Sequence, residues 1–194
     1  MFHRNMLVLC TLAWMAASVP ALAQEGATIL SQPDPDSPLG ERNLNGPPEL
    51  AQFDFVIGDW DAAIDWTSPE GEVTSYDARW HNIWIINGST VHQEWRGPYM
   101  TGAEFRGWDR QKGEWSGRNF YPASGEWKTT RAEMQGENMV VYILDAANAQ
   151  GPFINRETYF DITPDSFRMK SDRSFDDGET WQTGAYEMRC TRVP

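Results

Sequence analysis

The residues of this sequence that could perform chemistry gather in one stretch. Two histidines, His81 and His92, stand close to a carboxylate, Glu94. A carboxylate beside an imidazole holds its tautomer and raises its pKa, so the pair can act in general acid/base chemistry. Two imidazoles and a carboxylate can also bind a divalent metal, although the sequence has no H-x-H or H-E-x-x-H spacing. The simplest interpretation is a solvated polar strand face without a chemical role.

A turn signal determines which of these residues would meet. Asn87-Gly88 stands between two strand-like runs, and Asn-Gly is the strongest short signal for a two-residue type I′ hairpin. In that register His81 lies opposite Glu94, while Trp80 lies opposite Trp95 on the other face. The sequence leaves open which of the two faces points into the protein.

Arginines provide a second candidate site along the same segments. Inward-pointing guanidinium groups would form a receptor for a carboxylate or phosphate, whereas outward-pointing ones would only offset surface acids. His81 and Glu94 are the candidate catalytic pair of an enzyme alternative. The candidate ligand-binding residues are Arg79, His81, His92, Glu94, Arg96 and Arg106, and Arg118 is a further arginine of the series.

These residues need a scaffold, and the sequence predicts strands. From Asp59 to Trp66 acidic and apolar residues alternate strictly, as in a half-buried strand. No segment has a long helical periodicity, and tight-turn residues separate ten strand-like segments. Because an open meander would leave unpaired edges, we predict an all-β fold, a single antiparallel up-and-down barrel. The predicted strands are approximately 59–66, 73–86, 89–96, 103–109, 114–121, 126–134, 138–145, 152–162, 166–175 and 179–191.

One turn matches a known pattern. Residues 174–181 fit S-x-D-x-G-x-T-W, the Asp-box hairpin of sialidase-type propellers. Its Asp bonds turn amides, its Gly takes a positive φ, and its Trp packs beneath the loop. Propellers repeat the box in several blades and this chain has one copy, so it indicates a well-formed turn and not a sialidase.

Three motifs together resemble a bacterial family. They are F-D-F-x-x-G-x-W at residues 53–60, G-x-x-x-x-G-W-D at residues 102–109, and the S-x-D-x-G-x-T-W turn. The combination is similar to the family called domain of unknown function 1579, and the resemblance covers roughly Phe53 to Arg189. It implies a lipocalin-like, calycin-type barrel and no particular reaction.

Lipocalin-type barrels also carry G-x-W on the first strand, with that Trp packed against an Arg near the end of the last strand. Gly58-Asp59-Trp60 and either Arg189 or Arg192 occupy those places here. A guanidinium stacked on Trp60 would close one end of the barrel. The G-x-W-x-G-x-G-x-G run and the late ligand His of haem-binding nitrobindin-like proteins are absent, so the resemblance implies no haem.

The N-terminus predicts export. Residues 1–23 form a signal peptide by pattern: Arg4, an apolar core too short to span a bilayer, and Ala21-Leu22-Ala23 as the cleavage site. We therefore expect a periplasmic or extracellular protein, with a disordered Pro-rich linker at 24–52 and the barrel domain at 53–194. Cleavage also removes Cys10 and leaves Cys190 without a disulfide partner.

Composition restricts the partners. The formal net charge is -12, and removal of Arg4 leaves 15 basic against 28 acidic residues. Nucleic-acid backbones and anionic membranes need a basic surface, so neither is an expected partner, and no membrane insertion is expected after cleavage. The strand phases assign the aromatic residues Trp60, Trp66, Trp80, Trp84 and Trp127 to the core.

Together these patterns predict an exported barrel that binds a small apolar or anionic molecule in its cavity. One alternative is a hydrolase or isomerase that uses the His81–Glu94 pair. Another is an envelope scaffold or interaction module, since fold does not imply function. No metal or cofactor is predicted, and the sequence does not determine the oligomeric state.

Overall fold

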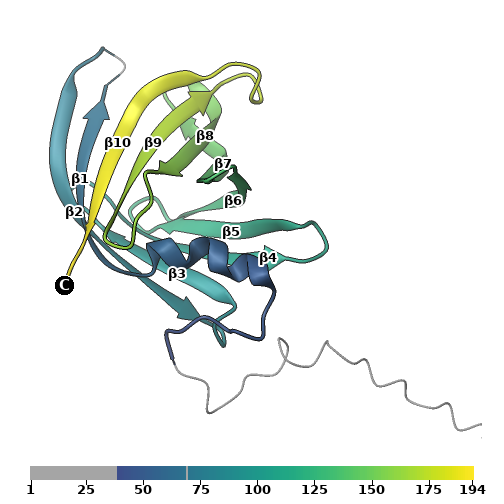
Figure 1. Cartoon of the computed structure of the whole chain (residues 1–194). Helices are drawn as coiled ribbons and strands as arrows, with labels where there is room; N and C mark the ends of the chain where they lie inside the picture. Colours follow the sequence, from purple (N-terminus) through teal and green to yellow (C-terminus); the bar gives the residue numbers. More distant parts are fainter. Residues whose placement is uncertain (1–38, 69) are drawn as a thin grey trace, which may run out of the picture.

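The computed structural model describes residues 39–68 and 70–194, which form one closed ten-stranded antiparallel barrel after a short 3-10 helix (Figure 1). Each strand pairs with its neighbours along the chain, and β1 pairs with β10 to close the sheet. The predicted all-β up-and-down barrel is therefore confirmed. The elements are η1 (Pro48–Val56), β1 (Gly58–Thr67), β2 (Val73–Ile85), β3 (Thr90–Arg96), β4 (Thr101–Asp109), β5 (Glu114–Tyr121), β6 (Glu126–Gln135), β7 (Asn138–Asn148), β8 (Gly151–Phe160), β9 (Ser166–Ser174) and β10 (Gln182–Arg192).

The predicted signal peptide and the linker up to residue 38 lie outside the described residues. Within the described part of the chain, no helix is both long and apolar enough to cross a membrane.

Strand alternation separates a buried core from a polar wall. In β1, Trp60, Ala62 and Ile64 are each at most 1% exposed, while Asp59 and Asp61 point to solvent. Because side chains of a strand alternate between its two faces, one phase of every strand can fill the barrel. Cys190 belongs to this buried phase, and burial raises the pKa of its free thiol, so the thiol packs in the core.

The hairpin of β2 and β3 has the predicted register. His81 pairs with Glu94 and Trp80 pairs with Trp95. The turn itself is longer than predicted, because ladder pairing ends at Ile85 and Thr90 and Ile86 also takes a positive φ of 50°. The preceding chain packs against this turn: the Asn43 N–H donates to the Gly88 carbonyl at 3.0 Å.

The helix η1 extends the folded part into the predicted linker. Its buried side chains are Leu50, Phe53 and Val56, three residues apart, which matches the three residues per turn of a 3-10 helix. The predicted linker reaches residue 52, but residues 48–52 belong to η1 and Leu50 is 1% exposed. In Figure 1 this dark blue helix lies across one end of the barrel.

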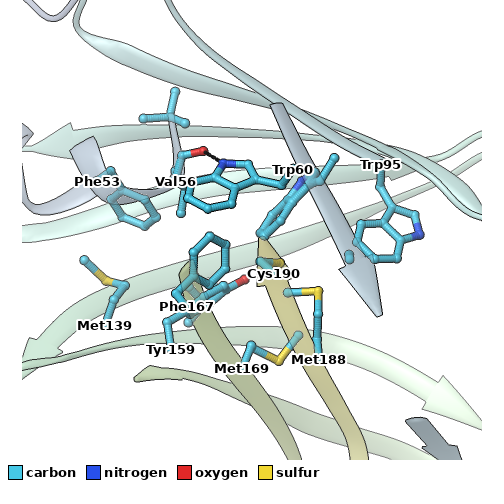
Figure 2. Close-up of a cluster of buried hydrophobic side chains, with 14 of the residues drawn as sticks. Phe53, Val56, Trp60, Trp95, Met139, Tyr159, Phe167, Met169, Met188 and Cys190 are labelled. Carbon is cyan, nitrogen blue, oxygen red and sulfur yellow. Dashed lines mark hydrogen bonds between the residues drawn. The ribbon is translucent and has the colours of Figure 1, made fainter. Parts of the chain in front are cut away.

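That end is sealed around Trp60. The indole N–H of Trp60 donates to the Val56 carbonyl at 2.7 Å, as Figure 2 shows, and Phe167 packs against the ring at 4.7 Å between centroids. The Arg192 guanidinium lies 4.1 Å from the Trp60 ring centroid and donates to the Ile57 carbonyl at 2.8 Å. The predicted stacked arginine is thus Arg192.

Gly58 makes this seal possible. It has a φ of +123°, and a Cβ there would clash with Nη1 of Arg192. The Gly of G-x-W therefore leaves the space that the guanidinium occupies. Arg189, the other candidate, points to the outer wall and donates to Asp65 at 3.0 Å.

Two of the five tryptophans assigned to the core are not buried. Trp66 is 36% exposed and Trp127 is 53% exposed. Trp66 has the inward phase but lies near the end of β1, beyond the filled part of the barrel. Trp127 has the outward phase of β6, where it packs on Phe120 with 4.8 Å between ring centroids.

The turn between β9 and β10 is held by its own side chains. Asp176 accepts hydrogen bonds from the Thr180 N–H at 2.9 Å and from the Thr180 hydroxyl at 2.6 Å. These bonds, with a further one from Ser174, lower the pKa of Asp176 to about 2. Gly178 has a φ of 92°, and Trp181 donates to its carbonyl at 3.1 Å.

Candidate ligand-binding site

Most of the predicted ligand-binding residues lie on the outer wall of the barrel. Trp80 and Trp95 occupy the interior phase of the β2–β3 hairpin and are 3% and 9% exposed. The opposite phase must then face solvent, so the side chains on it cannot contact a ligand inside the barrel. The residues placed outside in this way are Arg79, His81, His92, Glu94 and Arg96, together with Arg118.

The two residues of the acid/base alternative each have another partner. His81 Nδ1 lies 2.6 Å from Asp59 Oδ1, while Glu94 accepts a hydrogen bond from Arg96 at 2.8 Å. The bond from Arg96 lowers the pKa of Glu94, which keeps this carboxylate charged. Within residues 39–68 and 70–194 no three His, Cys, Asp or Glu side chains are arranged to hold a metal ion. On the outer wall His81 and Glu94 thus each contact a different partner.

Arg106 is the predicted arginine that points inward. Its side chain is 1% exposed, Nη1 lies 2.6 Å from Glu104 Oε2, and Nη1 also donates to Gln93 Oε1. Burial is the largest single effect and opposes its charge, but Glu104 together with the nearby Tyr159 and Glu157 outweighs burial and raises the pKa of Arg106. Gly117 leaves room for this side chain, since a Cβ there would lie 2.9 Å from Arg106 Cγ. Arg106 is thus already paired with a carboxylate inside the barrel.

A cavity of about 380 Å³ occupies the barrel beyond the sealed end. The inward-facing pairs of β8 and β9 show the order of the lining residues along the barrel. These pairs are, in sequence, Tyr159–Met169, Glu157–Ser171 and Asn155–Arg173. Phe167, two residues before Met169, packs on Trp60, so Arg173 lies toward the open end. The apolar lining includes Trp80, Trp95, Ile143, Phe153, Met169 and Met188, and the polar lining includes Glu104, Lys128, Asn155, Glu157, Ser171 and Arg173.

Glu157 is the interior acid that the sequence did not reveal. Its two oxygens accept hydrogen bonds from Asn155 at 3.3 Å and from the Tyr159 hydroxyl at 3.2 Å. Burial, and then the nearby Glu104 carboxylate, raise the pKa of Glu157 to about 7, against the opposing effect of Arg106. This shift keeps Glu157 protonated to a higher pH than an ordinary glutamate.

Two cations also line the cavity, and they differ in their partners. Lys128 Nζ lies 3.0 Å from Glu126 Oε2. Arg173 has no carboxylate within ion-pair distance among the described residues, and its Nε is buried without a hydrogen-bond partner. Its Cζ lies 5.3 Å from the Phe153 ring centroid, and burial lowers the pKa of Arg173. Of these two cations, Arg173 is therefore the one without a carboxylate partner among the described residues.

Polar atoms around Arg106 also lack protein partners. The described residues provide no hydrogen-bond partner for Nε and Nη2 of Arg106, Nε2 of Gln93 or Oδ1 of Asn119. Buried polar groups are almost always hydrogen-bonded, so these atoms can receive water or polar atoms of a ligand.

The sequence contained a signal for the missed residues. Phe167, Met169, Ser171 and Arg173 alternate in the predicted strand 166–175, with an apolar start and a charged end. That alternation places Arg173 in the phase of the core. The residues that form the rest of the cavity around Arg173 come from other strands, and no local pattern indicates them.

Comparisons with known proteins support the fold. No protein-family model matches the sequence, and no curated protein matches it. An S-type phycobiliprotein lyase from Guillardia theta has a similar structure, with a TM-score of 0.52 and 10% identity over 75% of this chain and 90% of that chain. Rv2717c from M. tuberculosis is also similar, with a TM-score of 0.53 and 12% identity over 76% of this chain and 99% of that chain. Identities this low show the lipocalin-like barrel fold alone.

Proposed function

We propose that this protein binds a small, mainly apolar molecule inside its barrel. The observation that carries the proposal is the cavity of about 380 Å³, which is sealed at one end and lined by aromatic and Met side chains at its depth. Ligand cavities typically measure about 300–1,000 Å³ and combine an apolar lining with a few polar groups. The signal-like N-terminus suggests that binding takes place in the periplasm or outside the cell.

The physical basis is the removal of apolar ligand surface from water. Each Å² of apolar surface buried contributes roughly 25 cal/mol, before the costs of ordering the ligand are subtracted. Trp80, Met169 and Met188 line the deep part of the cavity and would cover such a surface. The polar atoms near Arg106 and Glu157 would then select among apolar molecules by hydrogen bonding.

The enzyme alternative receives no support from the placement of His81 and Glu94 on the outer wall. The similar phycobiliprotein lyase is, by its name, an enzyme, so a barrel of this kind can carry an enzymatic activity. Fold likeness does not transfer that activity to this chain. The scaffold alternative predicts no ligand in the barrel, so the same binding test distinguishes it.

The test is binding of N-phenyl-1-naphthylamine, a neutral apolar dye whose fluorescence rises in apolar surroundings. We expect saturable binding to the purified protein and at least about a tenfold loss in Ala146→Trp, because this side chain would fill the cavity. Ala103→Trp is the matched control, since Ala103 lies on the outer wall of β4. Absence of saturable binding, or equal binding by Ala146→Trp, would contradict the proposal. Native mass spectrometry of freshly purified protein would also show a co-purifying ligand.

A further inference from the structure

The cavity carries a charge distribution that orients its ligand. Along the inward face of β9, Arg173 lies four positions after Met169, which corresponds to about 13 Å at the usual rise of a strand. Tyr159 pairs with Met169 at the lower level, and Asn155 pairs with Arg173 at the upper level. The cavity thus has an apolar lower level and a cationic upper level.

The side chain of Arg173 is held in place but has no ion-pair partner among the described residues. Its cross-strand neighbour Asn155 directs its side chain elsewhere, accepting from Ser171 at 2.6 Å and donating to Glu157 at 3.3 Å. Phe153 lies beside the guanidinium and limits its movement. A partly buried guanidinium without an anion is unfavourable, because desolvation penalises the charge. An anion delivered by a ligand would relieve that penalty through a bidentate contact.

The other cations near the cavity already have a carboxylate partner. Arg106 is paired with Glu104, and Lys128 is paired with Glu126. The carboxyl groups that line the cavity restrict where an anion can bind. Glu104 and Glu157 line the cavity below Arg173, so an anionic group placed deep in the barrel would meet carboxyl groups and be repelled.

We propose that the cavity accepts an amphipathic organic anion, whose acidic head is bound by Arg173 near the open end and whose apolar body extends toward Met169. The inference rests on the proposed function, since it assumes that the cavity holds a ligand. It adds the class of ligand and its orientation. Carboxylate, sulfonate and phosphate heads share the chemistry that a guanidinium recognises.

Two dyes that differ in one group provide the test. 8-Anilino-1-naphthalenesulfonate carries a sulfonate that N-phenyl-1-naphthylamine lacks, and their ring systems are the same. In the full chain we expect Arg173→Gln to weaken binding of the sulfonate dye about 10- to 100-fold, as is typical for loss of a charged hydrogen bond. Binding of the neutral dye should change less than about threefold, because it makes no contact that requires the charge.

Two further variants separate recognition from structure. Arg118→Gln removes an arginine from the outer wall and should leave binding of both dyes unchanged. Arg173→Lys keeps a charge and should retain part of the preference for the sulfonate dye, since Lys lacks the planar fork. Neither change at position 173 should lower the melting temperature, because Arg173 forms no ion pair with the described residues that could be lost.

The outcomes distinguish the two proposals. If the neutral dye does not bind, or binds equally to Ala146→Trp, the proposed function itself fails. If the neutral dye binds in the cavity but Arg173→Gln leaves the sulfonate dye unaffected, only the anion inference fails. Equal weakening of both dyes by Arg173→Gln would likewise overturn it, since that result indicates a structural role.

Discussion

The same residue types differ in burial and in hydrogen bonding between the two ends of the barrel. Trp60 and Trp66 lie on the same face of β1, yet Trp60 is fully buried and Trp66 is 36% exposed. Two arginines differ similarly. Arg192 donates to the carbonyls of Ile57 and Pro164 at 2.8 and 2.7 Å, whereas Nε of Arg173 has no partner among the described residues.

The difference separates a packed end of the barrel from a hollow end. At the sealed end the ring of Trp60 is packed between Phe167 and Arg192, so this end resembles an ordinary core. At the open end a cavity, an interior acid and an unpaired cation persist together. A cavity with an unpaired cation at its open end is the arrangement that the proposed ligand requires.

The largest expected effect comes from exchanging the two tryptophans for alanine. Trp60→Ala should lower the free energy of unfolding by about 3–5 kcal/mol, because it leaves a cavity in a packed region. Trp66→Ala, in the same strand and phase, should lower it by about 1 kcal/mol or less. Urea denaturation of both variants measures the contrast, and equal losses would show that the two ends are not differently packed.

A second prediction concerns the interior acid and the pH. The raised folded-state pKa of Glu157, about 7, means that the native state holds a proton that the unfolded state releases at lower pH. The contribution of Glu157 to stability is therefore complete below its ordinary pKa, which is near 4.5, and it is lost as the pH rises toward 7. Glu157→Gln, which stays neutral, should match the natural protein at pH 4.5 and exceed its stability at pH 8 by up to about 3 kcal/mol.

The measurement is the difference in the free energy of unfolding between the variant and the natural protein across this pH range. Glu137→Gln, in the exposed turn between β6 and β7, is the control for loss of a carboxylate. A difference that stays constant from pH 4.5 to pH 8 would show that Glu157 does not titrate inside the cavity.

The smallest of these effects tests how the seal is built. Gly58→Ala should lower the free energy of unfolding by about 2 kcal/mol, because alanine is strained at positive φ and its Cβ would displace Arg192. In an Arg192→Ala background only the strain remains, so the same change should cost about 1 kcal/mol less. A double-mutant cycle measures this coupling. If the two changes were strictly additive, glycine would be needed at position 58 only for its backbone conformation and not for the space that Arg192 occupies.

Local patterns predicted much of the architecture because a strand's side chains repeat every two residues. Asn87-Gly88 was sufficient to set the pairing of His81 with Glu94, although the actual loop is longer. The candidate site was harder to predict. Both faces of that hairpin mix residue types: Asn82 and Gln93 are buried inside, while Ile83 lies on the outward face.

The sequence by itself determined the number of strands and their alternation, since both depend on neighbours in the chain. Only the tertiary structure decided that Arg192, and not Arg189, stacks on Trp60. It also brought Glu157, Glu104 and Arg173 from three strands into one cavity. Closure of the sheet sets which distant residues share the interior, and no local period contains that information.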